Sequence, residues 1–379
     1  MREPDEPGPS ERPASGLEHF LAWPFAAVTQ VAQANLRLLE SLMPPVRQSA
    51  SPDFSFPWTS ANTIALELVT MRLRDFSIGA GGPATLICAP YALHGATIAD
   101  FAPGHSVVEA LCQSGLSRVF VTDWRPATTE TRYLTIDSYL ADLNVAVDEL
   151  GPPVDLIGLC QGGWLALVYA ARFPKKVRRL VLVGAPVDIA AAESQLSRFV
   201  AGTPSRMFDE FVRSGEGIVH GGRMLEMWGM AHGPGEAEAT LQTPDDIDPA
   251  RRRELNERFR QWYVETVELP GSFYLQVVKW IFRENRIAEG RFVALGQRID
   301  LAKLDAPMFL LAASHDEVVS VDQLFAVARL VGTPAGQIVK MTEPCVHLGL
   351  FLGAKVLDRP WRIIARWLVQ DLSEPRTRL

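Results

Sequence analysis

Cysteine is scarce in this sequence, and the few cysteines are widely separated. The 379 residues include four of them, namely Cys88, Cys112, Cys160 and Cys345. No two form a Cys-x-x-Cys pair, which argues against a zinc site and against a disulfide framework. The seven histidines are scattered too, without His-Glu-x-x-His or His-x-x-x-His spacing, so no metal site is expected. We therefore expect a protein of a reducing compartment, the cytoplasm.

The sequence also lacks an excess of basic residues and any long apolar run. Its 37 lysines and arginines against 44 aspartates and glutamates give a formal net charge of −7, which argues against general nucleic-acid binding. No stretch of about 18 uninterrupted apolar residues occurs, so we expect no transmembrane helix. Residues 1–16 are rich in proline and charge. We interpret them as a disordered tail and not as a signal peptide.

A first helix is predicted close to the N-terminus. Apolar residues recur at spacings of three and four between residues 17 and 43, namely at Leu21, Phe25, Val28, Ala32, Leu36, Leu39 and Met43. This is the pattern of an amphipathic helix. Two prolines end it, and residues 46–62 have the composition of a linker. The apolar face of the helix either packs on the body of the protein or docks a partner subunit or an apolar particle surface.

From residue 63 onward, short apolar runs alternate with helix-like stretches. The runs that we expect to be buried strands are residues 85–91, 118–124, 154–159, 180–184, 308–313 and 337–341. The helix-like segments between the early strands are residues 105–115, 135–151 and 164–173. Such alternation predicts a mostly parallel sheet with helices on both faces. With 47% hydrophobic residues, the chain can fill one such core, which we place at residues 63–188 and 301–379.

The alternation stops between residues 189 and 300. Polar, loop-like stretches and clustered aromatic residues take its place, the latter including Trp228, Trp262, Tyr263, Phe273, Tyr274 and Trp280. An insertion between two strands of such a sheet usually forms a cap over the site. We therefore expect residues 189–300 to form a mainly helical cap, in which most of the aromatic side chains hold the helices together.

One cysteine stands on a sharp turn between a predicted strand and a predicted helix, in the stretch GLCQGGW at residues 158–164. The glycine spacing around Cys160 is that of a nucleophile elbow, in which serine is the usual nucleophile. Side chains two residues before and after would collide, so Gly158 and Gly162 are required there, and Gly163 extends the pattern. The alternative is a buried structural cysteine, but strand, glycine spacing, nucleophile and helix would then coincide by accident.

The position of Cys160 at the start of a helix also suits acyl transfer. A helix N-terminus offers free N–H groups and a positive dipole, which favour a thiolate and a developing oxyanion. The backbone N–H of Gln161 is the expected first donor to that oxyanion. We expect the second donor from the stretch Tyr91–Gly95, with Ala92 as the candidate. His94 in this stretch is either a site residue or an ordinary loop histidine.

A nucleophilic cysteine needs a base, and in the α/β-hydrolase fold the acid and then the histidine follow the nucleophile along the chain. Asp316 follows the predicted strand at 308–313, and His347 follows the one at 337–341. Both therefore lie at carboxyl ends of strands, where an open parallel sheet places its ligand site. We predict an α/β-hydrolase fold with Cys160, Asp316 and His347 as its triad. His347 would take the thiol proton, and Asp316 would orient the imidazole.

Several separated segments resemble one family, the polyhydroxyalkanoate synthases. GLCQGG resembles the family's cysteine-bearing lipase box, and four further stretches are similar, namely VTDWRPATTETRYLTIDSYL, PYALHGATIADFAPGHSVVEAL, VLVGAPVDI and FRENRIAEGRFVALGQRIDL. The resemblance covers residues 63–370, and the short N-terminal region is similar to that of the two-component synthases. Two positions depart from the family pattern. Glu317 stands where histidine commonly follows the acid, and Val346 stands where glycine commonly precedes the catalytic histidine.

The resemblance implies an acyltransferase that polymerises 3-hydroxyacyl-coenzyme A through an acyl-cysteine and needs no cofactor beyond its thioester substrate. It further implies a growing polyester as the second substrate, a partner synthase subunit or a homodimer, and a place in the cytoplasm at the polymer granule surface. HLGLFLG also resembles the intracellular polyhydroxyalkanoate depolymerases, although these tend to lack the glycine pair at Gly162 and Gly163. A depolymerase or another thiol esterase or thioesterase is therefore the alternative. A non-catalytic granule protein of the same fold is the third interpretation, which the presence of all three triad residues disfavours.

Overall fold

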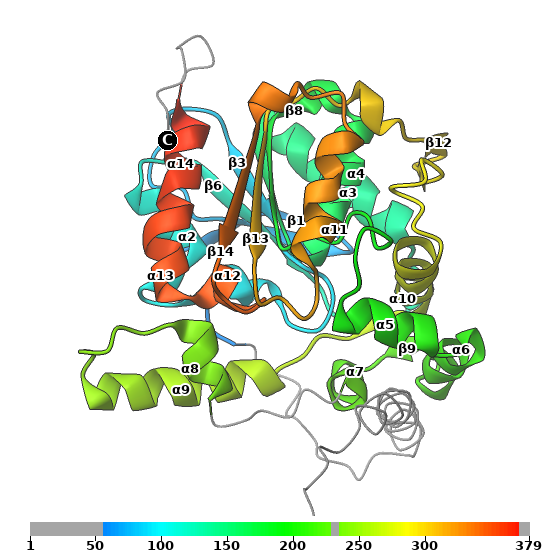
Figure 1. The fold of residues 1–379 in the computed structure, drawn as a ribbon, viewed down its shortest axis with the longest axis horizontal. Helices are drawn as coiled ribbons and strands as arrows, with labels where there is room; N and C mark the ends of the chain where they lie inside the picture. The colour runs from blue at the N-terminus through cyan, green and yellow to red at the C-terminus, as the bar shows by residue number, and fades with distance from the viewer. Residues whose placement is uncertain (1–55, 229–234, 371–379) are drawn as a thin grey trace, which may run out of the picture.

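The computed structural model describes residues 56–228 and 235–370, and its centre is an eight-stranded sheet (Figure 1). The strands lie in the order β1-β2-β6-β3-β7-β8-β13-β14. Their bounds are β1 Thr63–Glu67, β2 Met71–Asp75, β3 Thr85–Cys88, β6 Val119–Trp124, β7 Val154–Leu159, β8 Val177–Val183, β13 Met308–Ala313 and β14 Ile338–Glu343. Neighbouring strands from β6 to β14 are parallel, whereas β2 runs antiparallel to both β1 and β6. The prediction of a mostly parallel sheet is confirmed.

The central strands form where the sequence is continuously apolar. Every residue of β3, β7 and β13 is buried, as expected for strands that have helices on both faces. β8 begins at Val177, earlier than the predicted residue 180. Arg178 and Arg179 interrupt the apolar run at its start, so the sequence pattern did not reveal the first residues of the strand. The sequence analysis did not predict β1 and β2, which are an edge hairpin with many partly or fully exposed residues.

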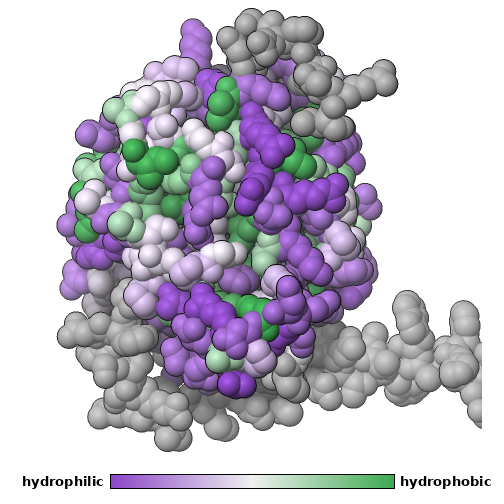
Figure 2. Space-filling model, turned by 90° about the vertical axis from the view of Figure 1, so that its left-hand side faces the viewer, coloured by the Kyte–Doolittle hydropathy of each residue, from purple (hydrophilic) through white to green (hydrophobic). Residues whose placement is uncertain are grey.

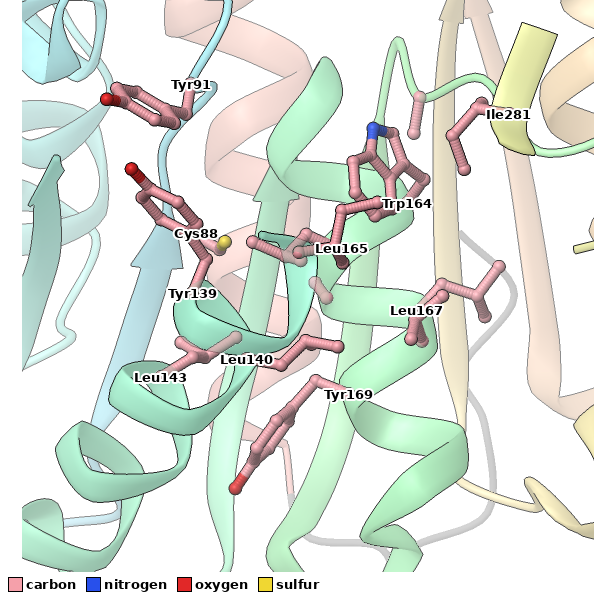
Figure 3. Close-up of a cluster of buried hydrophobic side chains, with 14 of the residues drawn as sticks. Cys88, Tyr91, Tyr139, Leu140, Leu143, Trp164, Leu165, Leu167, Tyr169 and Ile281 are labelled. Carbon is pink, nitrogen blue, oxygen red and sulfur yellow. The ribbon is translucent and has the colours of Figure 1, made fainter. Parts of the chain in front are cut away.

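Helices cover both faces of the sheet (Figure 1). On one face lie α3 Ile136–Leu150, α4 Gln161–Arg172 and α11 Val321–Phe325, and on the other lie α2 Val107–Gln113, α13 Ala354–Val356 and α14 Arg362–Val369. The apolar residues of α3 recur at helical spacing and are buried, namely Ile136, Tyr139, Leu140, Leu143, Ala146, Val147 and Leu150. Figure 3 shows side chains of α3 beside Leu165 and Tyr169 of α4. This packing fixes α4, and with it the turn that precedes α4.

Between β8 and β13 the chain leaves the sheet and is mainly helical. The elements there include α5 Gln195–Gly202, α6 Ser205–Ser214, β9 Ile218–Val219, α7 Gly221–Trp228, α8 Glu236–Leu241, α9 Pro249–Val264, β10 Leu269–Pro270, α10 Gly271–Gln276 and the π-helix η3 Val277–Arg283. Figure 1 shows α5 to α9 along one end of the sheet. We refer to residues 189–300 as the cap. Its boundaries with the core stay a prediction from the sequence.

The chain that leads into β1 is fastened to both the core and the cap. The backbone N–H of Phe56 donates to the Glu265 carboxylate at 2.7 Å, just beyond the end of α9. Farther along, the N–H groups of Thr59 and Ser60 donate to Asp100 at 2.8 and 2.7 Å. The predicted tail, the predicted helix at 17–43 and most of the predicted linker lie outside the described residues.

The surface mixes polar and apolar side chains. Figure 2 shows the face on the side of α2 and α14, where hydrophobic residues are scattered among hydrophilic ones, as is normal for a folded protein. No helix within residues 56–228 and 235–370 has the length and apolar character needed to cross a membrane.

Candidate active site

Cys160 occupies a backbone conformation that side chains rarely adopt. It joins β7 to α4 with φ 49° and ψ −119°. Holding a residue other than glycine in such a region costs about 1–3 kcal/mol, and the surrounding structure must enforce it. Here the Cys160 N–H donates to Val183 O, and the Gly163 N–H donates to Cys160 O, both at 2.9 Å. The turn therefore has the geometry of a nucleophile elbow, with the thiol raised at the start of α4.

The glycines around Cys160 leave no room for side chains. An added Cβ would lie 2.4 Å from Gly163 Cα at Gly158, and 2.1 Å from Cys88 O at Gly162. At Gly163 it would lie 2.2 Å from the Cβ of Ala185. Real Cβ atoms essentially never approach other atoms below 3.0 Å. The first turn of α4 thus touches the carboxyl ends of β3 and β8, and this close contact depends on the glycines.

His347 and Asp316 meet at the same edge of the sheet. Nδ1 of His347 lies 2.7 Å from Oδ2 of Asp316. Since an ionised carboxylate only accepts, Nδ1 donates, and Nε2 is left as the basic nitrogen of a neutral ring. The second carboxylate oxygen accepts from the N–H groups of Val318 and Val319, both at 2.8 Å. Asp316 is therefore fixed from two sides, and its side chain is only 1% exposed.

The pKa of His347 is shifted by burial and by its neighbours Asp316 and Cys160. Burial lowers this pKa, but the nearby charges of Asp316 and Cys160 and the hydrogen bond to Asp316 act in the opposite direction and hold it well above its ordinary value. The imidazolium form is therefore favoured when a thiolate stands beside it. Such a thiolate–imidazolium pair is the form in which a cysteine is nucleophilic near neutral pH.

The other three cysteines differ from Cys160 in their surroundings. Burial raises the pKa of Cys88 to about 12 and that of Cys112 to about 11. Burial and the nearby carboxylates of Asp316 and Glu343 raise the pKa of Cys345 to about 12. These thiols stay protonated at neutral pH, so they are poor nucleophiles.

The two predicted oxyanion donors reach one cavity. Gln161 is the first residue of α4, and Ala92 lies in the loop after β3; both line the cavity that also holds Cys160. The loop is tied to the cap, because the Val267 N–H donates to Leu93 O at 3.0 Å. His94 lines the same cavity and packs on Trp262, with ring centroids 4.4 Å apart. The roles of Gln161 and Ala92 stay predictions.

The cavity has a volume of about 630 Å³ and lies between the sheet edge and the cap. The core contributes Cys160, His347 and their neighbours, whereas the cap contributes mostly apolar side chains, among them Leu196, Val200, Phe208, Leu269, Phe273 and Val278. The polar side chains of Glu236, which is half-buried, and of His315 and Glu317, which are exposed, line it as well. Ligand sites are commonly apolar clefts of this size with a few polar groups.

The sequence predicts Cys160, Asp316 and His347 as a triad, but it did not predict most of this lining. The aromatic residues of the cap were interpreted as holding the cap together, and Phe273 and Tyr274 in fact also line the cavity. Trp280, in contrast, packs edge-on against Phe292 and does not line it. Nothing in the local pattern separates the two kinds of aromatic residue, because both are apolar and both are part of the cap.

Comparison with known families defines the class of this protein. A model described as alpha/beta hydrolase fold matches residues 104–354, a range that contains Cys160, Asp316 and His347. The chain belongs to the alpha/beta hydrolase fold family, in agreement with the predicted fold class.

Several curated relatives that this chain resembles are named as poly(3-hydroxyalkanoate) polymerase subunits. Poly(3-hydroxyalkanoate) polymerase subunit PhaC of Haloferax mediterranei is 24% identical over 293 residues, which are 75% of this chain but only 57% of that protein. The subunits of the same name from Allochromatium vinosum and Synechocystis are 25% and 27% identical, over 71% of this chain and 76% and 73% of theirs. These relatives confirm the family resemblance and agree with the prediction of an acyltransferase. Among solved structures, the monoacylglycerol lipase of Paleococcus ferrophilus matches 79% of this chain and 98% of its own, with 17% identity and a TM-score of 0.49.

Proposed function

We propose that this protein is a polyhydroxyalkanoate synthase that transfers 3-hydroxyacyl groups from coenzyme A to a growing polyester through an acyl-cysteine. The observation that carries the proposal is Cys160 on a strained elbow, next to the His347–Asp316 pair and open to an apolar cavity. The names of the relatives support the polymer as product.

In the first step the sulfur of Cys160 attacks the thioester carbonyl. His347 accepts the thiol proton at Nε2, and Asp316 holds the imidazolium through Nδ1–H. Negative charge develops on the carbonyl oxygen, and the backbone N–H groups of Gln161 and Ala92 would stabilise it by donating hydrogen bonds. The carbon–sulfur bond to coenzyme A then breaks, and His347 returns the proton to the departing thiolate. A thioester on Cys160 and free coenzyme A result.

In the second step a hydroxyl attacks the acyl-cysteine. The hydroxyl of another 3-hydroxyacyl unit gives its proton to His347, and its oxygen forms the new ester bond. The bond between the acyl carbon and the sulfur of Cys160 breaks, and the thiol is restored with the same proton. The carboxylate of Asp316 stabilises the imidazolium in both steps, and it matters more in this one, because a hydroxyl is far less acidic than the thiol of Cys160.

Whether the acyl group ends in polymer or in free acid depends on which nucleophile reaches Cys160. Water would give a hydrolase, and a chain-end hydroxyl gives a synthase. The cap surrounds the cavity with buried apolar side chains such as Phe208 and Phe273. An apolar, covered cavity disfavours water at the acyl-enzyme, which supports synthesis over hydrolysis.

The proposed enzyme acts in the cytoplasm at the granule surface, where its polyester product accumulates. The relatives are named as subunits, which supports a partner synthase subunit or a homodimer. The predicted amphipathic helix at residues 17–43 is the candidate docking element for that partner or for the granule. The chain alone is then expected to react at a lower rate, which rises when the partner is added.

A product analysis tests the proposal. The purified full chain is incubated with 3-hydroxybutyryl-coenzyme A, with 3-hydroxyoctanoyl-coenzyme A and, separately, with native polymer granules. We expect coenzyme A release with oligomeric ester as the main product, and free 3-hydroxy acid as the minor one. Free acid alone from the thioesters, together with acid released from granules, would replace this function with that of a depolymerase or thioesterase. No reaction in any mixture would indicate a non-catalytic granule protein.

A further inference from the structure

Two segments that lie far apart in the sequence meet at one buried carboxylate. Asp188 lies in the stretch VLVGAPVDI, and Asn285 lies in the stretch that begins FRENRI. The side-chain amide of Asn285 donates to Oδ1 of Asp188 at 2.7 Å, and the amide oxygen accepts from the Ile189 N–H at 3.1 Å. None of these residues belongs to the triad or lines the cavity, so the chemistry described above does not account for this contact.

The carboxylate of Asp188 is also bound to the core. Its Oδ2 accepts from the guanidinium of Arg329, the last residue of η5 Ala326–Arg329, which directly follows α11. Its Oδ1 accepts a further hydrogen bond from the Ala190 N–H at 3.1 Å. Only 9% of the Asp188 side chain is exposed, so these donors take the place of the water that a carboxylate would otherwise bind. Asp188 therefore joins the entry of the cap, the chain just beyond η3 and the core.

Gln323 of α11 holds the same entry segment from a second side. Its side chain is fully buried, and its amide donates to Ala192 O at 2.8 Å and to Ile189 O at 3.4 Å. Its backbone O accepts from the Asp188 N–H at 3.0 Å. The first residues of the cap are therefore fixed to the core along their whole length. We call Asp188, Asn285, Gln323 and Arg329 the cap joint.

The cap joint borders two elements that form the cap side of the cavity. α5 begins just after the segment that Gln323 holds, and η3 ends just before Asn285. Both elements line the cavity, through Leu196, Val200, Val278 and Phe282. At the end of η3 the Arg283 guanidinium donates to Val200 O at 3.1 Å, which fastens the two elements to each other. A displacement at the cap joint would therefore move both elements away from Cys160.

The cap joint is also continuous with the loop that holds the catalytic acid. Glu317 directly follows Asp316, and its backbone O accepts from the N–H of Gln195 at the start of α5, at 2.9 Å. α11 begins where this loop ends. There the Ser320 N–H donates to Gln323 Oε1 at 3.1 Å, and the Gln323 N–H donates to Ser320 Oγ at 3.2 Å. The cap thus rests on the same loop that positions Asp316.

We propose that Asp188 is a positioning residue that holds the cap over the acyl-cysteine and so determines whether water or a chain-end hydroxyl accepts the acyl group. This inference rests on the proposed function and adds the means by which hydrolysis is suppressed. When the cap is displaced, water adds to the acyl carbon and gives a proton to His347, and the bond to the sulfur of Cys160 breaks. The sulfur then regains that proton, and a free 3-hydroxy acid leaves.

The ratio of free acid to oligomer tests the inference. The full chain is incubated with 3-hydroxybutyryl-coenzyme A, and both products are quantified by liquid chromatography with mass spectrometry. The ratio counts only enzyme that has been acylated, so a smaller folded fraction does not alter it. A hydrogen bond to a charged group shifts an equilibrium by about tenfold or more, so Asp188→Ala should raise the ratio by about tenfold. A folded Asp188→Ala protein whose ratio stays within about twofold of wild type overturns the inference.

A second variant and a matched control connect the ratio to the cap joint. Arg329→Met removes a partly exposed partner of Asp188 and should raise the ratio by about threefold. Arg362→Met removes an arginine that contacts Asp358 at 2.9 Å at the start of α14, away from the cap joint, and it should leave the ratio unchanged. The double variant of Asp188→Ala and Arg329→Met should match Asp188→Ala alone, because both changes act on one contact. Effects that multiply in the double variant would contradict a shared joint.

Two further outcomes keep the inference separate from the proposed function. If Asp188→Ala does not fold, Arg329→Met and Asn285→Ala carry the test, and wild-type ratios in both overturn the inference. An unchanged ratio in these variants, beside a wild-type enzyme that forms oligomer, leaves the proposed function intact. A wild-type enzyme that forms only free acid would overturn the proposed function, and the inference would fall with it.

Discussion

Gly162→Ala should damage both the fold and the chemistry, because the added methyl group meets backbone. The new Cβ would lie 2.1 Å from Cys88 O and 2.7 Å from Ala89 O. Ordinary contact begins at 3.4 Å, so the start of α4 must move away from β3 by about 1 Å. Overpacking of this kind costs about 1–3 kcal/mol of unfolding free energy. A displacement of about 1 Å in a catalytic group also lowers the rate by roughly a hundredfold.

Two measurements and one control check this expectation. Denaturant unfolding gives the loss in unfolding free energy, and single-turnover release of coenzyme A gives the acylation rate. The control is Gly222→Ala, since a Cβ at Gly222 in α7 meets nothing within 4 Å. Alanine in a helix is favoured over glycine by about 0.5–1 kcal/mol, so the control should be as stable as the wild type or more so. If Gly162→Ala matched the control in stability and acylated at the wild-type rate, the close contact between α4 and β3 would not exist as described.

Four further outcomes follow from the triad. Cys160→Ala should abolish turnover and leave the unfolding midpoint nearly unchanged, as measured by circular dichroism, whereas Cys160→Ser should retain a trace of activity. Turnover by the alanine variant would refute the role of Cys160 as nucleophile. Iodoacetamide near pH 7.5 should modify Cys160 first, because the pKa values of the other three cysteines are about 11 or 12. Mass spectrometry of a tryptic digest measures the order of modification, and earlier modification of another cysteine would contradict this expectation. His347 has a raised pKa in the folded state, so its protonation stabilises the fold fully below about pH 6.5 and less as the pH rises through the folded pKa. His347→Gln should lose that pH dependence of the unfolding free energy. An unaltered pH profile in this variant would contradict the raised pKa of His347. Asp316→Asn should lower the pKa of His347 and slow turnover more than acylation, which stopped-flow release of coenzyme A separates from steady-state rates; equal losses would make Asp316 an ordinary orienting acid.

The sequence was most informative where one local pattern determines the structure. β7 and β13 begin and end where predicted, because a strand buried on both faces needs a continuous apolar run. Cys160 could be placed on its elbow because only glycines fit around that turn. Asp316 and His347 could be assigned because chain order and the ends of strands are visible in the sequence, and the structure joins their side chains at 2.7 Å.

The features that sequence reasoning missed depend on contacts between distant segments. The hairpin of β1 and β2 lies at an edge, where partial exposure removes the continuous apolar signal. The cap side of the cavity is lined by residues from α5, α6, α10 and η3, and most of them are apolar in the same way as those that only hold the cap together. Burial alone would not distinguish the residues that line the cavity from those that pack inside the cap, because both groups are buried and only the first faces a cavity.

The segment from Phe56 to Ser60 determines where a shortened version of this protein can begin. Asp100 is fully buried, and its carboxylate accepts from Thr59 N, Ser60 N and Ser60 Oγ at 2.7 to 2.8 Å. A truncation that starts at β1 removes all three donors and leaves Ser106 as the remaining side-chain donor to that carboxylate. Each lost bond to a buried acceptor costs about 1–3 kcal/mol. An expression fragment therefore has to include residues 56–60 and should not begin at β1, because these residues hold Asp100 in the core and, through Glu265, contact the cap.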